Sequence, residues 1–211
     1  MNKLVAAILS PPYNLFYRVR RKRRLLHGVN PARAVGLEIG PLDRPVVHKR
    51  DGKVWYVDIA SEAALKDRYH NDPAVRQESI CPVDFIWEGK PLRQIIPVAL
   101  VFDYVIASHV IEHTVGMIAW LKEIAEVMKP GAVFSLAVPD KRFTFDRDRE
   151  LTTLEDILAG RTKDRGEHMQ VFTCDSFASI MNAICPEIIP FKVVRLYQRG
   201  LWEFLVVLQR L

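Results

Sequence analysis

The sequence predicts a one-domain α/β protein built on a mostly parallel sheet of seven strands. Three observations support this fold class. Five short apolar runs each end at a turn or polar residue, helix-like segments lie between several of them, and two more apolar runs near the end of the chain have the spacing of a hairpin. Alternation of this kind is typical of a parallel sheet. With 211 residues, of which 49% are hydrophobic, the chain can bury one sizeable core.

Each element follows from its local pattern. Strands are expected at residues 34–39, 54–57, 81–86, 102–107 and 133–138, and the closing antiparallel hairpin at 191–196 and 204–208. Residues 61–69 and 117–128 are expected to form helices, and Lys129-Pro130-Gly131 is expected to stop the second of these. Thr152 and Glu155 have the spacing of a capping box, which predicts another helix start.

The basic charge is concentrated in an N-terminal arm. Residues 1–37 contain eight Lys and Arg and no acid, while the remaining residues contain 22 Lys and Arg against 25 acids. We therefore divide the chain into an arm at 1–30 and a domain at 31–211. The arm is interpreted as a helix that packs on the domain or covers a cofactor cleft. Alternatively, residues 13–27 contact an anionic membrane surface. Nucleic-acid binding is disfavoured, because the domain is mildly acidic.

The compartment is inferred from the cysteines and from hydropathy. Three widely spaced cysteines, with no CxxC pair, disfavour a disulfide framework and are expected to be small buried residues. No apolar run has the length of a membrane span, and the order of a signal peptide is missing. We predict a cytoplasmic protein, peripheral at the inner face of the membrane if the arm binds lipid.

Candidate binding residues follow four predicted strands, where ligands bind in open parallel sheets. These are Glu38 to Pro45, Asp58, Asp84 with Phe85, and Ser108 to His113. Gly40 allows a ligand close to the backbone, and an acid at Asp58 can accept both ribose hydroxyl protons. The glycines that cradle a pyrophosphate are missing, because Leu42 and Pro45 stand in their region. A nucleoside without phosphates is therefore favoured over a dinucleotide, and an oxidoreductase is disfavoured.

Together these segments resemble the class I S-adenosylmethionine-dependent methyltransferases, in particular a bacterial methyltransferase-domain group related to the type 11 family. The resemblance covers residues 34–146 most clearly. It is carried by 37–40 (LEIG), 56–58 (YVD), 102–113 (FDYVIASHVIEH), 127–131 (VMKPG) and 138–146 (VPDKRFTFD). It implies a Rossmann-like seven-stranded sheet with an antiparallel last strand, helices on both faces, and S-adenosylmethionine as cofactor.

The resemblance also implies roles at matching positions. Glu38 and Gly40 would line the methionine portion of the cofactor, Asp58 would hold the ribose, and Asp84 with Phe85 would contact the adenine. Ser108 and His109 would border the centre of methyl transfer. If the acceptor is a hydroxyl or an amine, His109 or His113 fits the role of base.

Two further groups of residues were considered for binding. Asp140, Arg142 and Phe143 follow the fifth strand, and we predict that they contact substrate within a substrate or lid region at 140–172. The polar segment 160–168 is interpreted as a lid or mobile loop within it.

A metal site is a separate possibility. It would combine His109, His113, His168 and Asp140 as ligands, but only the first two are four apart and no HExxH motif occurs, so no metal is predicted.

Two functions from different classes are compatible with these observations. The first is a methyltransferase acting on a small-molecule, glycan or lipid-linked acceptor. The second is a non-catalytic binding or scaffold protein with a degenerate methyltransferase fold that attaches to a membrane through its basic arm. The missing glycines favour the second hypothesis, whereas the combined motifs favour the first.

Overall fold

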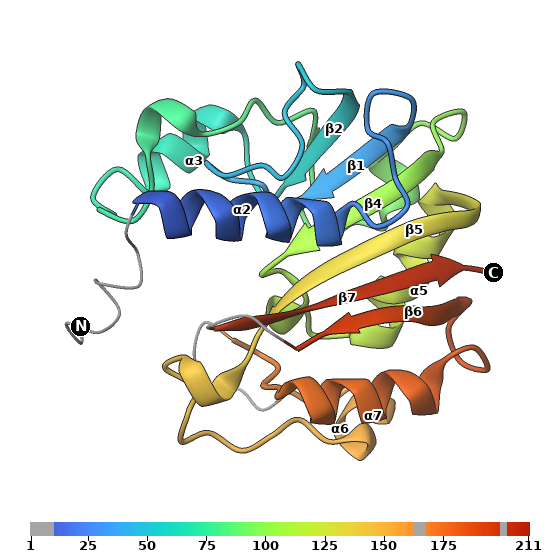
Figure 1. Ribbon diagram of the computed structural model, residues 1–211. Helices are drawn as coiled ribbons and strands as arrows, with labels where there is room; N and C mark the ends of the chain where they lie inside the picture. Colours follow the sequence, from blue (N-terminus) through green and yellow to red (C-terminus); the bar gives the residue numbers. More distant parts are fainter. Residues whose placement is uncertain (1–10, 163–167, 199–201) are drawn as a thin grey trace.

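The computed structural model describes residues 11–162, 168–198 and 202–211, with side chains from residue 15 onward. Within these residues one seven-stranded sheet has the order β3-β2-β1-β4-β5-β7-β6 (Figure 1). Strands β1 to β5 pair in parallel, and β7 lies antiparallel between β5 and β6. The predicted fold class and closing hairpin are confirmed. The strands are β1 Val35–Ile39, β2 Lys53–Asp58, β3 Phe85–Ile86, β4 Phe102–Ser108, β5 Met128–Pro139, β6 Phe191–Tyr197 and β7 Glu203–Arg210.

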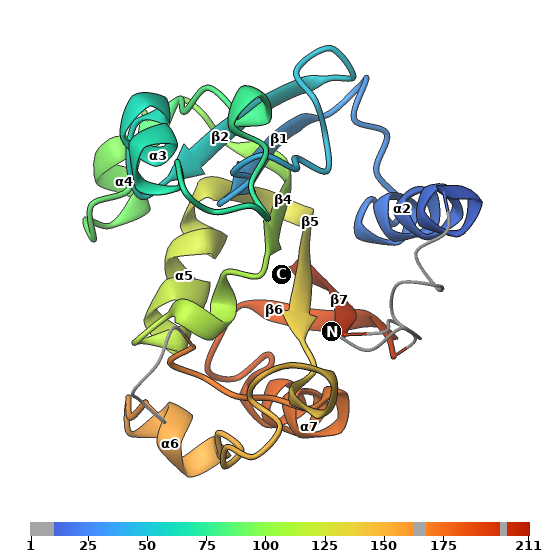
Figure 2. The ribbon, with the colours of Figure 1, turned by 90° about the vertical axis from the view of Figure 1, so that its left-hand side faces the viewer.

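Helices cover both faces of the sheet, and Figure 2 shows α2 and α5 on opposite sides of it. The larger core joins the sheet to α5 and α7, with Trp120 and Phe177 among its buried side chains. The smaller core, on the other face, includes Leu25 of α2 packed with Val47 and Tyr104. The helices are α2 Pro11–Leu25, α3 Glu62–Arg68, α4 Leu92–Ile95, α5 Met117–Val127, α6 Leu154–Leu158 and α7 Cys174–Ile184.

The N-terminal helix α2 covers a part of one sheet face that the connection between β1 and β2 does not cover with a helix. Parallel strands are usually connected through a helix, but residues 40–52 between β1 and β2 are all described and contain none. Their chain contributes Val46 and Val47 to the smaller core, beside Leu25 of α2. Residues 1–10 of the predicted arm lie outside the described part of the chain, and its helix α2 packs on the domain as one of the two interpretations expects.

Three local predictions differ from the structure. Of the strand expected at 81–86 only Phe85–Ile86 forms, because one parallel pairing with β2 spans just these residues. The helix expected to stop at Lys129-Pro130-Gly131 does end just before it, at Val127, but the strand expected at 133–138 begins at Met128, so these three residues lie inside β5. The register of β4 and β5 shifts there, as expected for a bulge at a proline followed by a left-handed glycine with φ +78°.

The capping box before α6 is one residue later than predicted. Thr153 caps the helix and Asp156 returns the second hydrogen bond, so Thr152 and Glu155 are not the pair. Both registers fit the sequence pattern. The hydroxyl of Thr152 accepts a hydrogen bond from the backbone N–H of Val171, and this tertiary contact selects the observed register.

Cysteines and hydropathy agree with the expectations that the structure can test. Cys81 and Cys174 are buried, Cys185 is half-buried, and all three are free thiols. Among the residues described, no helix combines the length and the apolar character needed to cross a bilayer. Of the predicted lid segment 160–168, residues 163–167 lie outside the described part of the chain.

Candidate functional site

The carboxyl ends of β1, β2 and β4 meet at one edge of the sheet, as the parallel pairing requires. Gly40 follows β1 with φ +62°, and a Cβ atom there would lie 3.0 Å from Val110 Cγ2. Its backbone N–H donates to Val57 O at 2.8 Å, which fixes the turn beside β2. A side chain at this position would be strained and crowded, so glycine keeps the edge open to a ligand.

Asp58 ends β2 at the same edge and is nearly buried. Its Oδ1 accepts a hydrogen bond from the backbone N–H of Ile59 at 2.8 Å, while Oδ2 is buried and has no hydrogen-bond partner among the residues that the structure describes. Burial raises the pKa of this carboxyl group. An unpartnered carboxylate oxygen at a strand end is suited to accept a hydrogen bond from a hydroxyl group of a ligand.

Glu38 differs from Asp58, because both of its oxygens already have partners. They accept hydrogen bonds from the backbone N–H groups of Val46 at 2.7 Å and Val47 at 3.1 Å. Glu38 is fully buried, and burial raises its pKa to about 7. In this structure Glu38 holds the loop that follows β1 in place.

The predicted position of Asp84 at a strand end is wrong. Asp84 immediately precedes β3, and its carboxylate accepts hydrogen bonds from the backbone N–H of Tyr56 and from Lys49 Nζ. Phe85 packs against the larger core. β3 is only two residues long, and Ile86 pairs with Asp58. Trp87 is therefore the residue that follows the strand beside Asp58, and its backbone N–H donates to Asp58 O.

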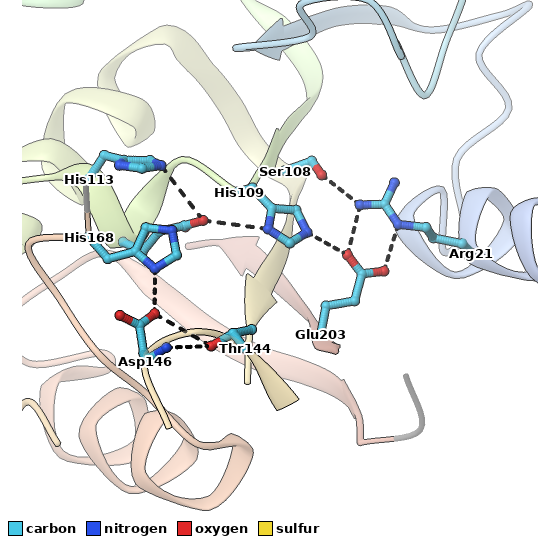
Figure 3. A network of polar contacts seen from close by, with 9 residues as sticks. Arg21, Ser108, His109, His113, Thr144, Asp146, His168 and Glu203 are labelled. Atoms are coloured by element: carbon cyan, nitrogen blue, oxygen red, sulfur yellow. Dashed lines mark hydrogen bonds and ion pairs between the residues drawn. The ribbon is translucent and has the colours of Figure 1, made fainter. Parts of the chain in front are cut away.

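A polar network connects the end of β4 to the N-terminal helix (Figure 3). His109 follows β4 in the left-handed region, with φ +55°. Its Nε2 lies 2.9 Å from Glu203 Oε2, and Glu203 also accepts hydrogen bonds from Arg21 Nε at 2.6 Å and from the Tyr17 hydroxyl at 2.7 Å. Arg21 donates a further hydrogen bond to Ser108 Oγ at 2.6 Å. The network therefore fixes α2 and His109 relative to each other.

The charge of Glu203 is stabilised although the residue is buried. Burial alone would raise its pKa, but the hydrogen bond from His109 and the charge of Arg21 lower it to about 2. Nε2 of His109 faces this carboxylate and Nδ1 points away from it, and the side chain is 38% exposed. His109 is thus oriented and accessible.

A cavity of about 780 Å³ lies between α2 and this edge of the sheet. Of the described residues, five Lys and Arg side chains and one carboxylate, that of Glu203, line it. Its basic residues are Arg18, Arg21, Lys22, Arg44 and Arg76, and its other lining residues are Leu15, Tyr17, Val19, Pro45, Val46, His48, Ser108, His109 and Trp202. Asp43, which is buried behind the cavity, accepts hydrogen bonds from both Arg44 and Arg76 at 3.2 Å. The cavity presents positive charge to a ligand.

His113 belongs to a second polar cluster next to the cavity. Its Nε2 lies 4.0 Å from Glu112 Oε1, and its ring packs at 5.0 Å against that of His168. His109 Nδ1 lies 3.6 Å from the same Glu112 oxygen, so Glu112 lies between the two predicted bases.

The predicted substrate residues after β5 do not line the cavity. Asp140 is buried, and its carboxylate binds the guanidinium of Arg142 and caps the short helical turn Lys141–Phe143. Burial opposes its charge, but these hydrogen bonds hold the pKa of Asp140 below its usual value. Phe143 is exposed beneath Arg142. Here Asp140 has a structural role, and contact with substrate stays a prediction for Arg142 and Phe143.

Sequence reasoning missed Glu203 and Arg21 as site residues. One signal was available for Glu203, which is an isolated acid directly before five consecutive apolar residues. No comparable signal distinguished Arg21 within the basic run, because choosing among neighbouring arginines requires the helix to be docked.

Comparisons with known proteins agree on one fold. A family model described as a methyltransferase domain matches residues 13–184. PH0226 from Pyrococcus horikoshii OT3 is 19% identical, with a TM-score of 0.58 over 97% of this chain and 93% of its own. The CcbJ methyltransferase from Streptomyces caelestis is 14% identical, with a TM-score of 0.56 over 92% and 96%.

A third solved structure is the magnesium protoporphyrin IX methyltransferase from Synechocystis PCC 6803, determined with bound S-adenosylmethionine. It is 12% identical, with a TM-score of 0.52 over 92% of this chain and 78% of its own. No curated protein sequence matches the chain.

Proposed function

Because the chain belongs to the methyltransferase domain family, we propose that it transfers a methyl group from S-adenosylmethionine to an anionic acceptor bound in the basic cavity. The observation that carries this proposal is the buried, unpartnered Oδ2 of Asp58 at the edge where Gly40 leaves the backbone open. This pair suits a nucleoside ribose. The loop after β1 lacks the glycines of a pyrophosphate cradle, which favours a nucleoside cofactor over a dinucleotide.

The residues present fit the proposed cofactor. Asp58 would hold the ribose hydroxyls, and Gly40 would lie against the rest of the molecule. When bound, S-adenosylmethionine supplies a methyl group on a positively charged sulfur. Ser108 and His109, at the end of the adjacent strand β4, border the cavity in which the acceptor would lie.

The acceptor is defined by the charge and the size of the cavity. Five basic side chains line the cavity against the carboxylate of Glu203. Asp43 and Asp51 pair with three of these cations from outside the lining, so an excess of positive charge remains and favours a ligand with a phosphate or carboxylate group. The volume of about 780 Å³ is within the range of small-molecule sites. The acceptor is therefore a small acidic molecule, or the acidic end of a glycan or of a lipid-linked precursor.

His109 serves as the base in this proposal. Glu203 accepts the hydrogen bond from Nε2 and leaves Nδ1 to take the proton of an acceptor hydroxyl or amine as the new bond to carbon forms. Glu203 is itself held by Arg21 and Tyr17. These two positioning residues keep the imidazole oriented, and orientation supplies much of the acceleration of a displacement reaction.

The test is a calorimetric titration with S-adenosylmethionine, S-adenosylhomocysteine and, for comparison, NAD. We expect micromolar binding of both sulfur nucleosides and none of NAD. Asp58→Asn should weaken this binding at least 10-fold, because the amide repels one ribose donor, while the matched variant Asp72→Asn on the surface should bind like wild type. Either sulfur nucleoside should raise the melting temperature of the wild type.

A folded protein that binds neither sulfur nucleoside would contradict the proposal. The alternative, a binding or scaffold protein with a degenerate methyltransferase fold, would then account better for the missing glycines. Unchanged affinity in a folded Asp58→Asn protein would remove Asp58 from the site and leave the enzyme class in place.

A further inference from the structure

A cluster of potential metal ligands consists of residues that have no role in the proposed methyl transfer. Glu112 and His113 belong to the short helical turn Ile111–His113 after β4, and His168 comes from the segment that precedes α7. One ligand atom from each residue can be chosen so that all lie within 4.8 Å of one another. The cluster is thus built from two parts of the chain more than 50 residues apart. Figure 3 shows His113 and His168 side by side, with Asp146 beyond His168.

Glu112 is the unusual member of this cluster. Its side chain is 0% exposed, and neither carboxylate oxygen has a hydrogen-bond partner among the described residues. The nearest basic nitrogen atoms are His109 Nδ1 at 3.6 Å and His113 Nε2 at 4.0 Å, both beyond hydrogen-bond length. Burying a carboxylate without a partner is costly, and a bound cation would offset that cost.

His168 is oriented for coordination by a second carboxylate. Its Nδ1 lies 2.5 Å from Asp146 Oδ2, which leaves Nε2 as the outward nitrogen. Asp146 is buried and is held in turn by Arg149 at 2.6 Å. Metal-bound histidines usually donate their second ring N–H to a carboxylate in this way. His113 is 46% exposed, so an ion can enter from solvent and keep water as a further ligand.

We propose that Glu112, His113 and His168 bind a divalent transition-metal ion, with Asp146 holding His168 from behind. Two imidazoles and one carboxylate are ligands that suit Zn²⁺ and its neighbours in the first transition series, whereas Mg²⁺ and Ca²⁺ prefer oxygen ligands alone. Three protein ligands with one open side are typical of sites that retain an exchangeable water.

The ligand set differs from the combination considered from the sequence. That combination included Asp140, whose carboxylate is occupied by Arg142, and His109, whose Nε2 is held by Glu203. Glu112 was not part of that combination. The position of His168 could not be foreseen without the tertiary structure.

The proposal is tested by titrating Zn²⁺ into the untagged full-length protein after treatment with chelator, by calorimetry. We expect one equivalent to bind, and Co²⁺ in its place should give the ligand-field absorption of a nitrogen-ligated ion. Glu112→Gln and His168→Ala should each weaken binding at least 100-fold. Asp146→Asn should weaken it about 10–100-fold. The matched control is His70→Ala, an exposed histidine after α3, which should bind like wild type.

Melting temperatures of all variants show whether each remains folded, and the isosteric Glu112→Gln change is the one least expected to disturb folding. If the folded wild type bound no stoichiometric Zn²⁺, the site would not exist. If Glu112→Gln and His168→Ala bound Zn²⁺ like wild type, the ion would be held elsewhere and the assignment would be wrong. Neither result depends on whether the protein binds S-adenosylmethionine, so the two proposals fail independently.

Discussion

Glu38 and Glu203 are both buried near the strand ends, yet their pKa values are shifted in opposite directions. Burial dominates at Glu38, whose partners are two backbone N–H groups, and raises its pKa to about 7. At Glu203, burial is outweighed by His109 and Arg21, and the pKa falls to about 2. Neutral donors offset burial less than a cation does, and each shift has a consequence that can be measured.

From the raised pKa of Glu38 we predict that the free energy of unfolding decreases as pH rises. Because its folded pKa lies near 7 against an ordinary value of 4.5, the folded state retains a proton that the unfolded state has released. Its contribution is fully present below about pH 4.5 and is lost as pH rises through 7, by about 3 kcal/mol in all.

Urea denaturation of wild type and Glu38→Gln between pH 5 and pH 8 measures this difference. The variant should show a flatter profile, whereas the exposed control Glu88→Gln should keep the slope of wild type. Parallel profiles for wild type and Glu38→Gln would show that Glu38 titrates normally.

From the contacts of Glu203 with Arg21 and His109 we predict a loss of stability when only the charge of Glu203 is removed. In Glu203→Gln the partly buried guanidinium of Arg21 loses its counter-charge, which should cost about 2 kcal/mol in the free energy of unfolding. The exposed pair of Glu155 and Arg161 offers the matched control, and Glu155→Gln should change stability by less than about 0.5 kcal/mol. Urea denaturation at pH 7 measures both, and equal small losses would mean that Arg21 finds another partner.

Among the secondary-structure elements, α2 contributes most to the site relative to its length. Tyr17, Arg21 and Leu25 recur every four residues and face the domain, where they reach Glu203 and the smaller core. Leu15, Phe16 and Val19 are exposed, although Leu15 and Val19 also line the cavity. One helix thus forms a wall of the cavity and presents apolar and basic side chains to solvent.

The outer side of α2 supports a proposal that the structure leaves untested, namely contact with an anionic membrane surface. Exposed Arg20 and Arg23 would bind anionic headgroups while Phe16 and its apolar neighbours enter the interface. Sedimentation with vesicles should show binding to phosphatidylglycerol but not to phosphatidylcholine alone, with weakening as salt increases.

Variants on α2 and elsewhere separate this contact from general stickiness. Leu15→Ser with Phe16→Ser should weaken vesicle binding at least 10-fold, whereas Val98→Ser, at an exposed apolar residue outside α2, should not. Binding that is indifferent to lipid charge, or to the α2 variants, would exclude the membrane contact and leave α2 only its place over the cavity.

At the scale of the whole molecule, one sheet edge gathers side chains from distant parts of the chain. Asp58 and His109 come from strand ends, Arg21 from the N-terminal helix and Glu203 from the closing hairpin. The proposed cofactor contacts lie at β1 and β2, the cavity lies between α2 and this edge, and the proposed metal ligands lie beyond β4. The three share this edge because parallel strands present their carboxyl ends together.

The sequence by itself determined the seven strands, the parallel sheet, the closing hairpin and the positions of Gly40, Asp58 and His109. These follow from local rules, because apolar runs and turn residues fix strands, and strand ends fix where ligands bind. Only the tertiary structure decided that Arg21 meets Glu203, that Asp84 precedes its strand, and that His168 lies beside Glu112. Such contacts join residues far apart in the chain, and local patterns carry no information about which distant partner a charged side chain will reach.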